Sequence, residues 1–311
     1  MHYTGTIWRP PYEASSLLLE VTAGCTHHKC KFCTLYNDLP FQFRMSPLED
    51  IRSDLQEVQL WSTDPVSMLA ARLQGMSRPE RIQRAFLTGA NPFVLKADRL
   101  MAVAGLIRQY IPSIKTIGCF ARITDVTRKS DEDLEALHGA GYDGLTIGME
   151  TGDDEALEFM NKGYAAADIV EQCRRLDRAG IHYSFFCLVG ISGAGRGEIG
   201  ANATAAVCNQ LHPQLIGVNM LTIYPDSELF QEIQRGNWKE ESEIEKYKEI
   251  RTLLESLEIP TQFAALGASN AFQFQGTLPE DKGALAAALD KIIGTVKEAD
   301  LREYRVNLRH L

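Results

Sequence analysis

The sequence predicts an α/β fold, because short apolar segments alternate with helical patterns along most of the chain. The predicted strands are rich in β-branched and aromatic residues, as expected for strands that are buried on both faces. They cover residues 16–21, 84–87, 114–120, 144–149, 182–189 and 215–223. Strands that are joined by helices run parallel with right-handed crossovers, which leaves two choices, a doubly wound sheet or a complete or partial barrel.

Helical patterns lie between the predicted strands. The first opens at Ser46, which we expect to be the N-cap, with Pro47 in the first turn and Glu49 completing a capping box. The helices that follow are predicted at residues 96–111, 131–139, 153–160, 165–179 and 196–210.

The alternation ends near residue 224. Beyond it we predict a connecting loop at 261–276, a short surface tail at 301–311, and helices at 227–235, 239–257 and 279–296. No predicted strand is followed by a Rossmann glycine fingerprint or a Walker loop. We therefore expect the glycine-rich segment 193–197 to be an active-site loop and not a phosphate-binding turn.

The composition narrows the class of protein. A chain of 311 residues with 45% hydrophobic residues is long enough for one large core or two small domains. Its net charge of -9 argues against a nucleic-acid partner, which usually requires a basic face. No apolar run reaches the ~20 residues that span a bilayer, and the N-terminus lacks the apolar core of a signal peptide. We expect no membrane partner and a cytoplasmic location.

Three cysteines near the N-terminus are the strongest functional signal. Cys25, Cys30 and Cys33 have the spacing C-x4-C-x2-C and follow the apolar run 17–21. Three thiolates on a short loop after a strand can hold three corners of an iron–sulfur cube and leave one iron open for chemistry. A structural zinc site with His27 or His28 as the fourth ligand is the alternative.

The remaining cysteines are scattered and do not make a disulfide framework. We expect them to be ordinary buried core thiols, at positions Cys119, Cys173, Cys187 and Cys208.

A cysteine triad on the loop after the first strand of a β/α chain resembles the radical S-adenosylmethionine (SAM) superfamily. The usual spacing in that superfamily is C-x3-C-x2-C, and this chain has one extra residue between Cys25 and Cys30. Phe32 precedes Cys33, as in the superfamily, where the aromatic residue lies near the adenine of SAM. The resemblance implies that Cys25, Cys30 and Cys33 bind a [4Fe-4S] cluster.

Further positions extend the resemblance. The turn after the second strand contains Gly89 and Asn91. In the superfamily a glycine-rich turn there receives the amino group of SAM, and here only Gly89 remains of the glycine pair. Glu150 closes the fourth strand and Lys162 follows it. This pair resembles the coproporphyrinogen-oxidase-like branch, in which it contacts the ribose and carboxylate of SAM.

Two other strand ends are implied to face SAM. Arg122 follows the third strand, and the resemblance implies that it meets SAM or a substrate carboxylate. Leu188 lies at the end of the fifth strand, where backbone groups of the superfamily contact adenine. Segment 268–279 resembles the tail of uncharacterised members of the same branch, and residues 267–274 are expected either to cover the barrel mouth or to serve as a connector.

The resemblance implies a partial (β/α)6 TIM-type barrel over residues 1–225 and a C-terminal helical extension over residues 226–311. The implied function is that of a radical SAM enzyme whose [4Fe-4S] cluster cleaves SAM and thereby abstracts hydrogen from a small or medium-sized metabolite. An electron donor such as flavodoxin or ferredoxin is the implied protein partner. An RNA-modifying radical SAM enzyme and a non-catalytic metal-binding protein are the alternatives.

Overall fold

The computed structural model describes residues 1–73 and 82–308, so residues 309–311 of the predicted surface tail lie outside the described part. The chain divides into two compact units that interleave along the sequence. The first unit consists of residues 1–28, 35–146 and 175–181, and the second of residues 29–34, 147–174 and 182–311. The predicted domain boundary at residue 225 stays a prediction.

The first unit contains a parallel part of the sheet. Strands β1 (Leu17–Glu20), β4 (Arg84–Thr88) and β5 (Thr116–Ala121) are neighbours in this order. Leu19 is aligned with Leu87, and Leu87 with Cys119. Two short strands, β2 (Thr22–Gly24) and β3 (Phe43–Met45), pair separately in antiparallel register.

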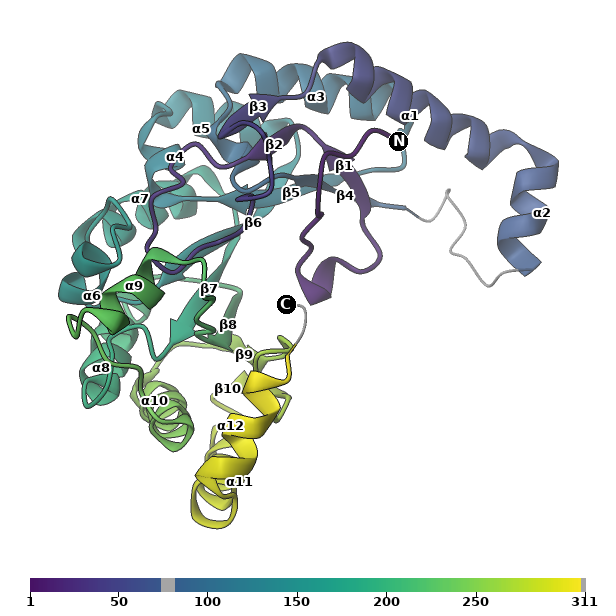
Figure 1. Cartoon of the computed structure of the whole chain (residues 1–311). Coiled ribbons are helices and arrows are strands. Elements are labelled where there is room, and N and C mark those ends of the chain that lie inside the picture. The colour runs from purple at the N-terminus through teal and green to yellow at the C-terminus, as the bar shows by residue number, and fades with distance from the viewer. Residues whose placement is uncertain (74–81, 309–311) are drawn as a thin grey trace. The chain divides into compact units, whose positions relative to one another are not determined.

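Helices cover the strands of this unit. Helix α1 (Leu48–Thr63) packs against α3 (Ala97–Tyr110), and α3 packs against α5 (Asp131–Gly139), as Figure 1 also shows. Helix α2 (Pro65–Leu73) follows α1, and α4 (Ile123–Thr127) follows β5. Short 3-10 turns lie at η1 (Pro11–Glu13) and η3 (Pro92–Val94).

The second unit continues with strands β7 (Tyr183–Val189), β8 (Leu215–Met220), β9 (Thr261–Ala265) and β10 (Phe274–Leu278), which are neighbours in this order. All pairs among them are parallel except β9 with β10, which is antiparallel. Strand β6 (Tyr142–Glu150) runs from the first unit into the second. Together these are the strands of a mostly parallel eight-stranded sheet, which confirms the predicted α/β fold class of a partial TIM-type barrel.

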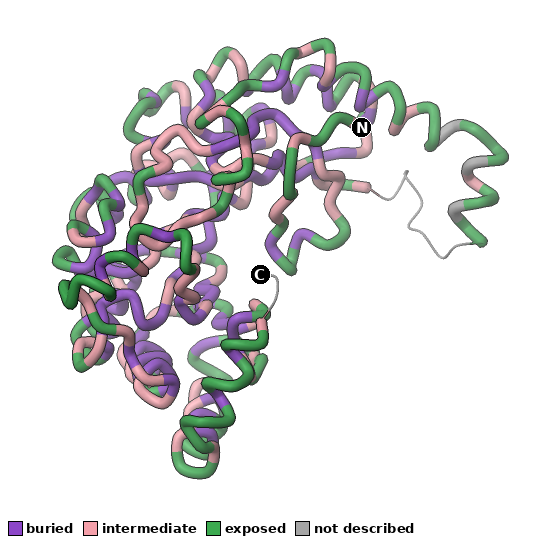
Figure 2. Tube along the Cα trace, viewed as in Figure 1, coloured by how far each residue is buried: buried purple, intermediate pink, exposed green. Residues whose placement is uncertain are grey.

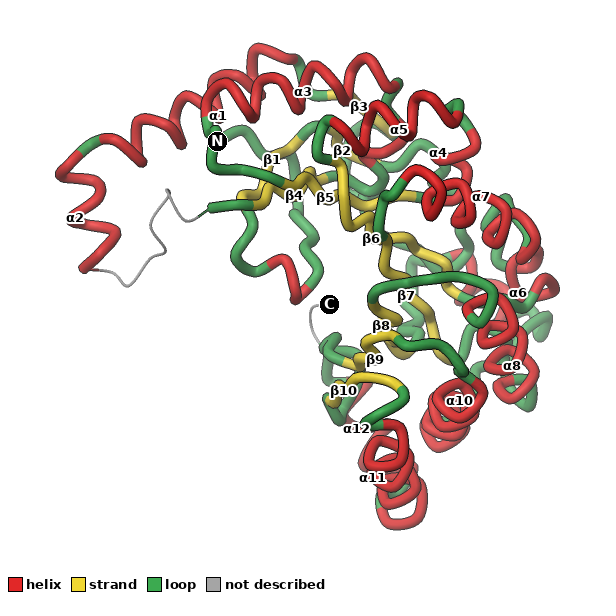
Figure 3. The backbone as a smooth tube through the Cα atoms, turned by 180° about the vertical axis from the view of Figure 1, so that it is seen from behind, coloured by secondary structure: helices red, strands yellow, loops and turns green. Residues whose placement is uncertain are grey.

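The helices of the second unit are α6 (Asp154–Phe159), most of α7 (Ala166–Ala179), α8 (Gly197–Cys208), α9 (Glu228–Gln234), α10 (Glu243–Ser256), α11 (Lys282–Thr295) and α12 (Glu298–Val306). Helix α10 packs against α8, α11 and α12. Seen from behind in Figure 3, α11 and α12 lie beside β9 and β10 at the C-terminal end of this unit.

Each unit has its own apolar core. Figure 2 shows buried backbone along the parallel strands and on the helix faces that pack against them. In the first unit Phe86 and Ile123 are fully buried, and in the second Tyr183, Phe185 and Phe263 are. These cores are what hold the strand ends, and the residues beyond them, in place.

Three sequence predictions were wrong. The segment 261–276, predicted as a loop, forms β9 and most of β10, because Phe263, Ala264 and Ala265 pair with neighbouring backbone and are buried. The tail after residue 297 contains helix α12. Pro47, not Ser46, is the N-cap of α1, because the Ser46 hydroxyl instead donates to Glu20 Oε1 at 3.4 Å.

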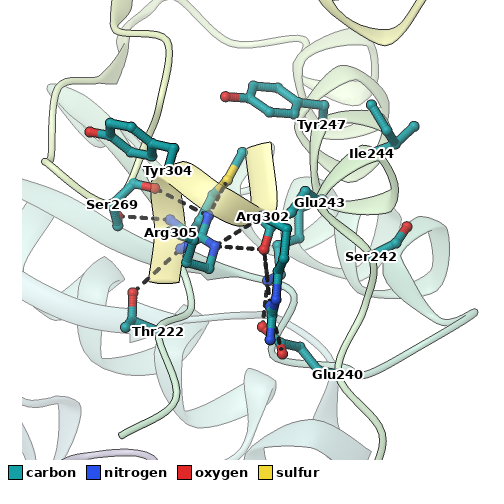
Figure 4. Close-up of polar contacts among 12 residues, drawn as sticks. Thr222, Glu240, Ser242, Glu243, Ile244, Tyr247, Ser269, Arg302, Tyr304 and Arg305 are labelled. Carbon is teal, nitrogen blue, oxygen red and sulfur yellow. Dashed lines mark hydrogen bonds and ion pairs between the residues drawn. The ribbon is translucent and has the colours of Figure 1, made fainter. Parts of the chain in front are cut away.

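Helix α12 is anchored by one buried arginine (Figure 4). The Arg305 side chain is 6% exposed, and its Nε lies 2.8 Å from both carboxylate oxygens of Glu243, which is 1% exposed. Arg305 Nη2 also donates to the Ser269 backbone oxygen at 3.1 Å, and Met220 N donates to Ser269 Oγ at 3.1 Å. Ser269, within the segment 267–274, is thereby held against the end of β8.

We predict that Arg305→Ala lowers the free energy of unfolding by about 3–5 kcal/mol, because it leaves the Glu243 carboxylate buried without its main partner. Arg302→Ala is the matched control, since Arg302 pairs with the same Glu243 but its side chain is 50% exposed. That change should cost less than about 1 kcal/mol. Urea unfolding of both variants measures the difference, and equal losses would contradict the anchoring role of Arg305.

Candidate functional site

The predicted site residues lie on residues 25–33, in the last residues of strands or just beyond them, and, for Lys162, after helix α6. Those in the first unit are Cys25, Gly89, Asn91 and Arg122. Those in the second unit are Cys30, Phe32, Cys33, Glu150, Lys162 and Leu188. Each group is described within its own unit.

Cys25 follows β2 and is set by the glycine before it. Gly24 has a φ of +77°, and a Cβ at this position would lie 2.2 Å from the Gln42 backbone oxygen. The Cys25 N–H donates to the same Gln42 oxygen at 2.9 Å. Only glycine fits here, because both the positive φ and the close backbone approach exclude a side chain.

Gly89 closes β4 against a pair of buried hydroxyls. Its φ is +127°, and a Cβ here would lie 2.0 Å from Thr22 Oγ1. Thr22 and Thr88 are 1% and 2% exposed, and in the described residues neither hydroxyl has a hydrogen-bond partner. Only glycine fits at this position, because Thr22 occupies the place of a side chain, and the backbone of the turn is left uncovered by any side chain of its own.

Asn91 ties the residue after Cys25 to a buried acid. Its Nδ2 donates to Thr26 Oγ1 at 2.9 Å and to the two oxygens of Asp125 at 3.1 and 3.2 Å. Its Oδ1 accepts from Thr26 N at 3.4 Å. Because Asn91 is fully buried and its amide is used in these bonds, it holds the cysteine segment in position.

Arg122 shares this network through its backbone. Its N–H donates to Asp125 Oδ2 at 2.8 Å, at the start of α4. Burial raises the pKa of Asp125 to about 6, against the lowering effects of the Arg122 backbone bond and the Asn91 amide. Lys129, whose pKa burial lowers to about 8, donates to the backbone oxygens of Phe93 and Asp125.

In the second unit, Cys30 and Cys33 lie on one tight turn. Cys33 N donates to the Cys30 oxygen at 3.0 Å. Lys31 N donates to the Met160 oxygen at 3.1 Å, and Leu229 N donates to the Lys31 oxygen at 2.7 Å. Because the N–H and the oxygen of Lys31 are both hydrogen-bonded, the backbone that carries the two cysteines is fixed in position.

Glu150, Lys162 and Phe32 lie close together in the second unit. Lys162 Nζ lies 2.9 Å from Glu150 Oε1, and the two side chains are 5% and 12% exposed. The same Nζ lies 5.9 Å from the centre of the Phe32 ring and 5.4 Å from that of Tyr164. Tyr164 is a member of this group that the sequence analysis missed, since nothing in its local pattern marks it.

Two features maintain this pair. Glu150 has a φ of +66°, an uncommon conformation for a residue other than glycine. A Cβ on Gly148 would lie 2.8 Å from Glu150 Oε1, so the glycine makes room for the carboxylate. A non-glycine residue in the left-handed region at a strand end is a frequent mark of a functional position.

Phe32 and Leu188 line one apolar surface. Both pack against a buried cluster that includes Met160, Ile191 and Leu221. An aromatic ring and an aliphatic side chain over one apolar base, with a carboxylate and an ammonium group beside Phe32, fit a ligand that has a flat ring and polar substituents.

The seven cysteines fall into two classes. Those of the triad are partly exposed, whereas Cys119, Cys173, Cys187 and Cys208 are buried. Burial raises the pKa of Cys119 and Cys187 far above that of a free thiol, and that of Cys208 to about 12. Metal-binding thiols must deprotonate, so only the triad has the exposure that a cluster requires.

An iron–sulfur cluster takes cysteine thiolates as ligands, and residues 25–33 carry three partly exposed cysteines that are not in disulfides. In residues 1–73 and 82–308, no three His, Cys, Asp or Glu side chains are gathered closely enough to hold a metal ion. The alternative zinc site would need His27 or His28 as its fourth ligand. The Nε2 atom of His28 lies 2.9 Å from Asn37 Oδ1, so this ring nitrogen is already in contact with an amide oxygen.

Comparison with protein families identifies the fold's relatives. The family model described as "Radical SAM superfamily" matches residues 19–203, which is more than half of the 311-residue chain. A search of curated proteins found no match.

Among the described residues, no helix has both the length and the apolar character that crossing a bilayer demands.

Solved structures share the fold at low identity. The radical S-adenosylmethionine methyltransferase TsrM from Kitasatospora setae, with cobalamin and a [4Fe-4S] cluster bound, is 15% identical, with a TM-score of 0.51 over 71% of this chain and 37% of its own. Coproporphyrinogen III oxidase (HemN) from Escherichia coli is 15% identical, with a TM-score of 0.51 over 77% and 50% of the two chains. Methylornithine synthase (PylB) is 14% identical, with a TM-score of 0.50 over 93% and 85%. The chain thus spans less than two thirds of the first two of these proteins.

We predict that Asn91→Ala lowers the free energy of unfolding by about 1–3 kcal/mol, because Asp125 loses a donor in a buried position. Gln42→Ala is the control, since the exposed Gln42 side chain also bonds to Thr26: its Nε2 donates to the Thr26 backbone oxygen at 3.2 Å. Loss of this bond should lower the free energy of unfolding by less than about 0.5 kcal/mol. Thermal or urea unfolding measures both. A loss for Asn91→Ala no larger than that for Gln42→Ala would contradict the role given to Asn91.

Proposed function

The chain belongs to the radical SAM superfamily, a family of enzymes that use a [4Fe-4S] cluster and SAM, and we propose that it abstracts hydrogen from a small or medium-sized metabolite. The single observation that supports this best is the partly exposed cysteine triad within the matched region, in a chain whose other cysteines are buried. A metal that keeps an open coordination position is suited to catalysis more than to structural support.

In this proposal Cys25, Cys30 and Cys33 hold the cluster through their thiolates. When bound and reduced, the cluster would supply one electron to the sulfonium of SAM, so that its C5′–S bond breaks, methionine leaves, and the 5′-deoxyadenosyl group becomes able to take a hydrogen atom from the substrate. The protein binds and orients the cluster, SAM and the substrate, and it excludes water from them. The hydrogen-bonded backbone at Lys31 and the Gly24 turn keep the thiols in place for this task.

The SAM contacts are proposed from the two groups of residues described above. Glu150 accepts hydrogen bonds from ribose hydroxyls, and Lys162 attracts the carboxylate of SAM. Phe32 and the end of β7 at Leu188 contact the adenine. These roles are supported by the 2.9 Å Lys162–Glu150 pair and by the apolar cluster on which Phe32 and Leu188 pack.

Three residues of the first unit complete the proposed cofactor site. The Gly89 backbone receives the amino group of SAM, beside the orphaned Thr22 and Thr88 hydroxyls. Asn91 positions the cysteine segment through Thr26. Arg122 meets SAM or a substrate carboxylate at the end of β5.

Charge supports a small-molecule substrate, and the spacing of Glu150 and Lys162, which resembles the coproporphyrinogen-oxidase-like branch, supports the same proposal. A net charge of -9 favours a small molecule over RNA, and an RNA-modifying enzyme is the second candidate. A reductant such as flavodoxin or ferredoxin is the proposed electron donor. A non-catalytic metal-binding protein is the third candidate.

We predict that the anaerobically reconstituted protein, reduced with dithionite, forms 5′-deoxyadenosine from SAM and that Cys30→Ala abolishes this because one cluster ligand is lost. Iron and sulfide content and chromatography of the products measure the outcome. Cys208→Ala is the control, since Cys208 is a fully buried core residue outside residues 25–33, and this variant should retain both cluster and activity. Equal product from the wild type and Cys30→Ala would overturn the assignment, and absence of any product would favour the non-catalytic candidate.

We predict that Lys162→Met weakens SAM binding by roughly tenfold or more, because a buried ammonium group beside the SAM carboxylate is removed. Lys29→Met is the control, since Lys29 is exposed on the cysteine segment and should change the dissociation constant less than about twofold. Equilibrium binding of SAM to the cluster-loaded protein measures both. Unchanged affinity in Lys162→Met would remove Lys162 from the site.

A further inference from the structure

A buried acid holds the end of β7. Glu249 lies on α10 and is 6% exposed. Its Oε2 accepts the N–H of Gly190 at 2.6 Å. Gly190 follows directly on Leu188 and Val189, so this carboxyl group is bonded to the backbone at the point where adenine contact is proposed.

A second buried acid faces the first. Glu241, in the segment before α10, is 2% exposed, and in the described part of the chain neither of its carboxyl oxygens has a hydrogen-bond partner. A Cβ on Gly197 would lie 2.7 Å from Glu241 Oε1 and 3.2 Å from the Glu249 Cβ. Both acids therefore pack against the same position at the start of α8, and a side chain on Gly197 would displace them.

The charges around the two acids do not neutralise both. Lys246 on α10 is fully buried, and its Nζ lies 2.8 Å from Glu240 Oε1 and 3.5 Å from Glu243 Oε1, so its charge is shared with other carboxylates. The other titratable groups that act on the pair are Glu245 from α10, which is negative, and Cys187 from β7, which is neutral.

The neighbouring element adds no positive charge at this point. Helix α8 faces the pair with Gly197 and Gly200. The Ser192 hydroxyl is buried and lies 2.5 Å from the position of a Cβ on Gly200, which in turn lies 3.6 Å from Glu249 Oε1. Lys248 and Arg251 line the same pocket as Glu249, and Arg251 is paired with Glu255 and Asp290.

Two carboxylates at such a place cannot both be ionised without a large cost, because the medium is poorly polarisable and their charges repel. One proton held between them supplies the donor that Glu241 otherwise lacks and leaves Glu249 free to accept from Gly190. Burial raises the pKa of Glu241 to about 7, and burial together with the Glu241 charge raises that of Glu249 well above its usual value.

We propose that Glu249 is a positioning residue that holds the end of β7 through Gly190, and that it does so as a buried pair sharing one proton with Glu241. The consequence for SAM rests on the proposed function: when the shared proton is lost at alkaline pH, the two carboxylates repel each other, which displaces Glu249 from Gly190 and weakens the binding of SAM. A pocket of about 600 Å³, lined in part by Gly197, Glu245 and Glu249, gives solvent a route to Glu249.

The shared proton is tested first by stability, without cofactor. Because the carboxyl pKa values are higher in the folded than in the unfolded protein, the free energy of unfolding falls as pH rises from about 4.5 through about 7, and it continues to fall above that because the pKa of Glu249 is also raised well above its usual value. The Glu241→Gln variant has an amide N–H group that can donate at every pH. Its Tm should therefore fall much less than that of the wild type between about pH 5 and about pH 8. Glu258→Gln, on an exposed residue, is the control and should fall in parallel with the wild type.

A wild-type Tm that does not fall, or a Glu241→Gln profile with the wild-type slope, would overturn the shared proton. A Tm at about pH 8 that rises on addition of Mg²⁺ or Ca²⁺ in the wild type and not in Glu241→Gln would overturn it as well, because a cation would then neutralise the pair.

The positioning role is tested by equilibrium binding of SAM to the cluster-loaded protein. At about pH 6, Glu249→Gln retains an acceptor for Gly190 and should bind SAM within about twofold of the wild type, whereas Glu249→Ala should bind roughly tenfold more weakly. Equal affinities for the two variants would overturn the positioning role. Failure of the wild type itself to bind SAM would overturn the proposed function instead, while the stability profiles would still report on the pair.

Discussion

The constraint on which the structure depends is that parallel strands deliver their ends to one edge of a sheet. In the first unit β4 and β5 are parallel with Leu87 aligned to Cys119, so the residues that follow them, Gly89 and Arg122, leave the sheet on the same side. In the second unit the parallel β7 and β8 end at Val189 and Met220, which are aligned with each other. Functional groups can then be contributed by separate strands without any special local sequence.

Buried polar groups hold these strand ends, and each does so through a partner distant in sequence. Asn91 bonds Thr26 and Asp125, and Arg305 bonds Glu243. In a poorly polarisable interior an unpaired group of this kind is costly, so each partner fixes the position of the other. The same reasoning applies to Glu241 and Glu249, where the missing partner is a proton. Residues in these networks act on the proposed chemistry by position and need not touch a ligand.

The sequence located the six strands of the alternating region to within a few residues, because apolar β-branched runs bounded by helical patterns are a local property. It missed β9 and β10, since Ala264 and Ala265 are weak strand formers by local preference and become part of a strand only by pairing with β8 and β10. The N-cap of α1 was misplaced for a related reason. The Ser46 hydroxyl finds a distant partner in Glu20, and no local rule includes it.

The sequence by itself determined the alternating α/β class, the cysteine spacing and the membership of a superfamily that this spacing and the strand ends indicated. These three features depend on residues that are close together in the sequence, so they can be recognised without knowledge of the structure. Only the tertiary structure decided that Lys162 lies against Glu150 and beside Phe32, that Asn91 is committed to Thr26 and Asp125, and that Glu241 faces Glu249. Such pairs depend on burial and on contacts between segments far apart in the chain, and residue type and spacing do not encode which polar group will lose its water.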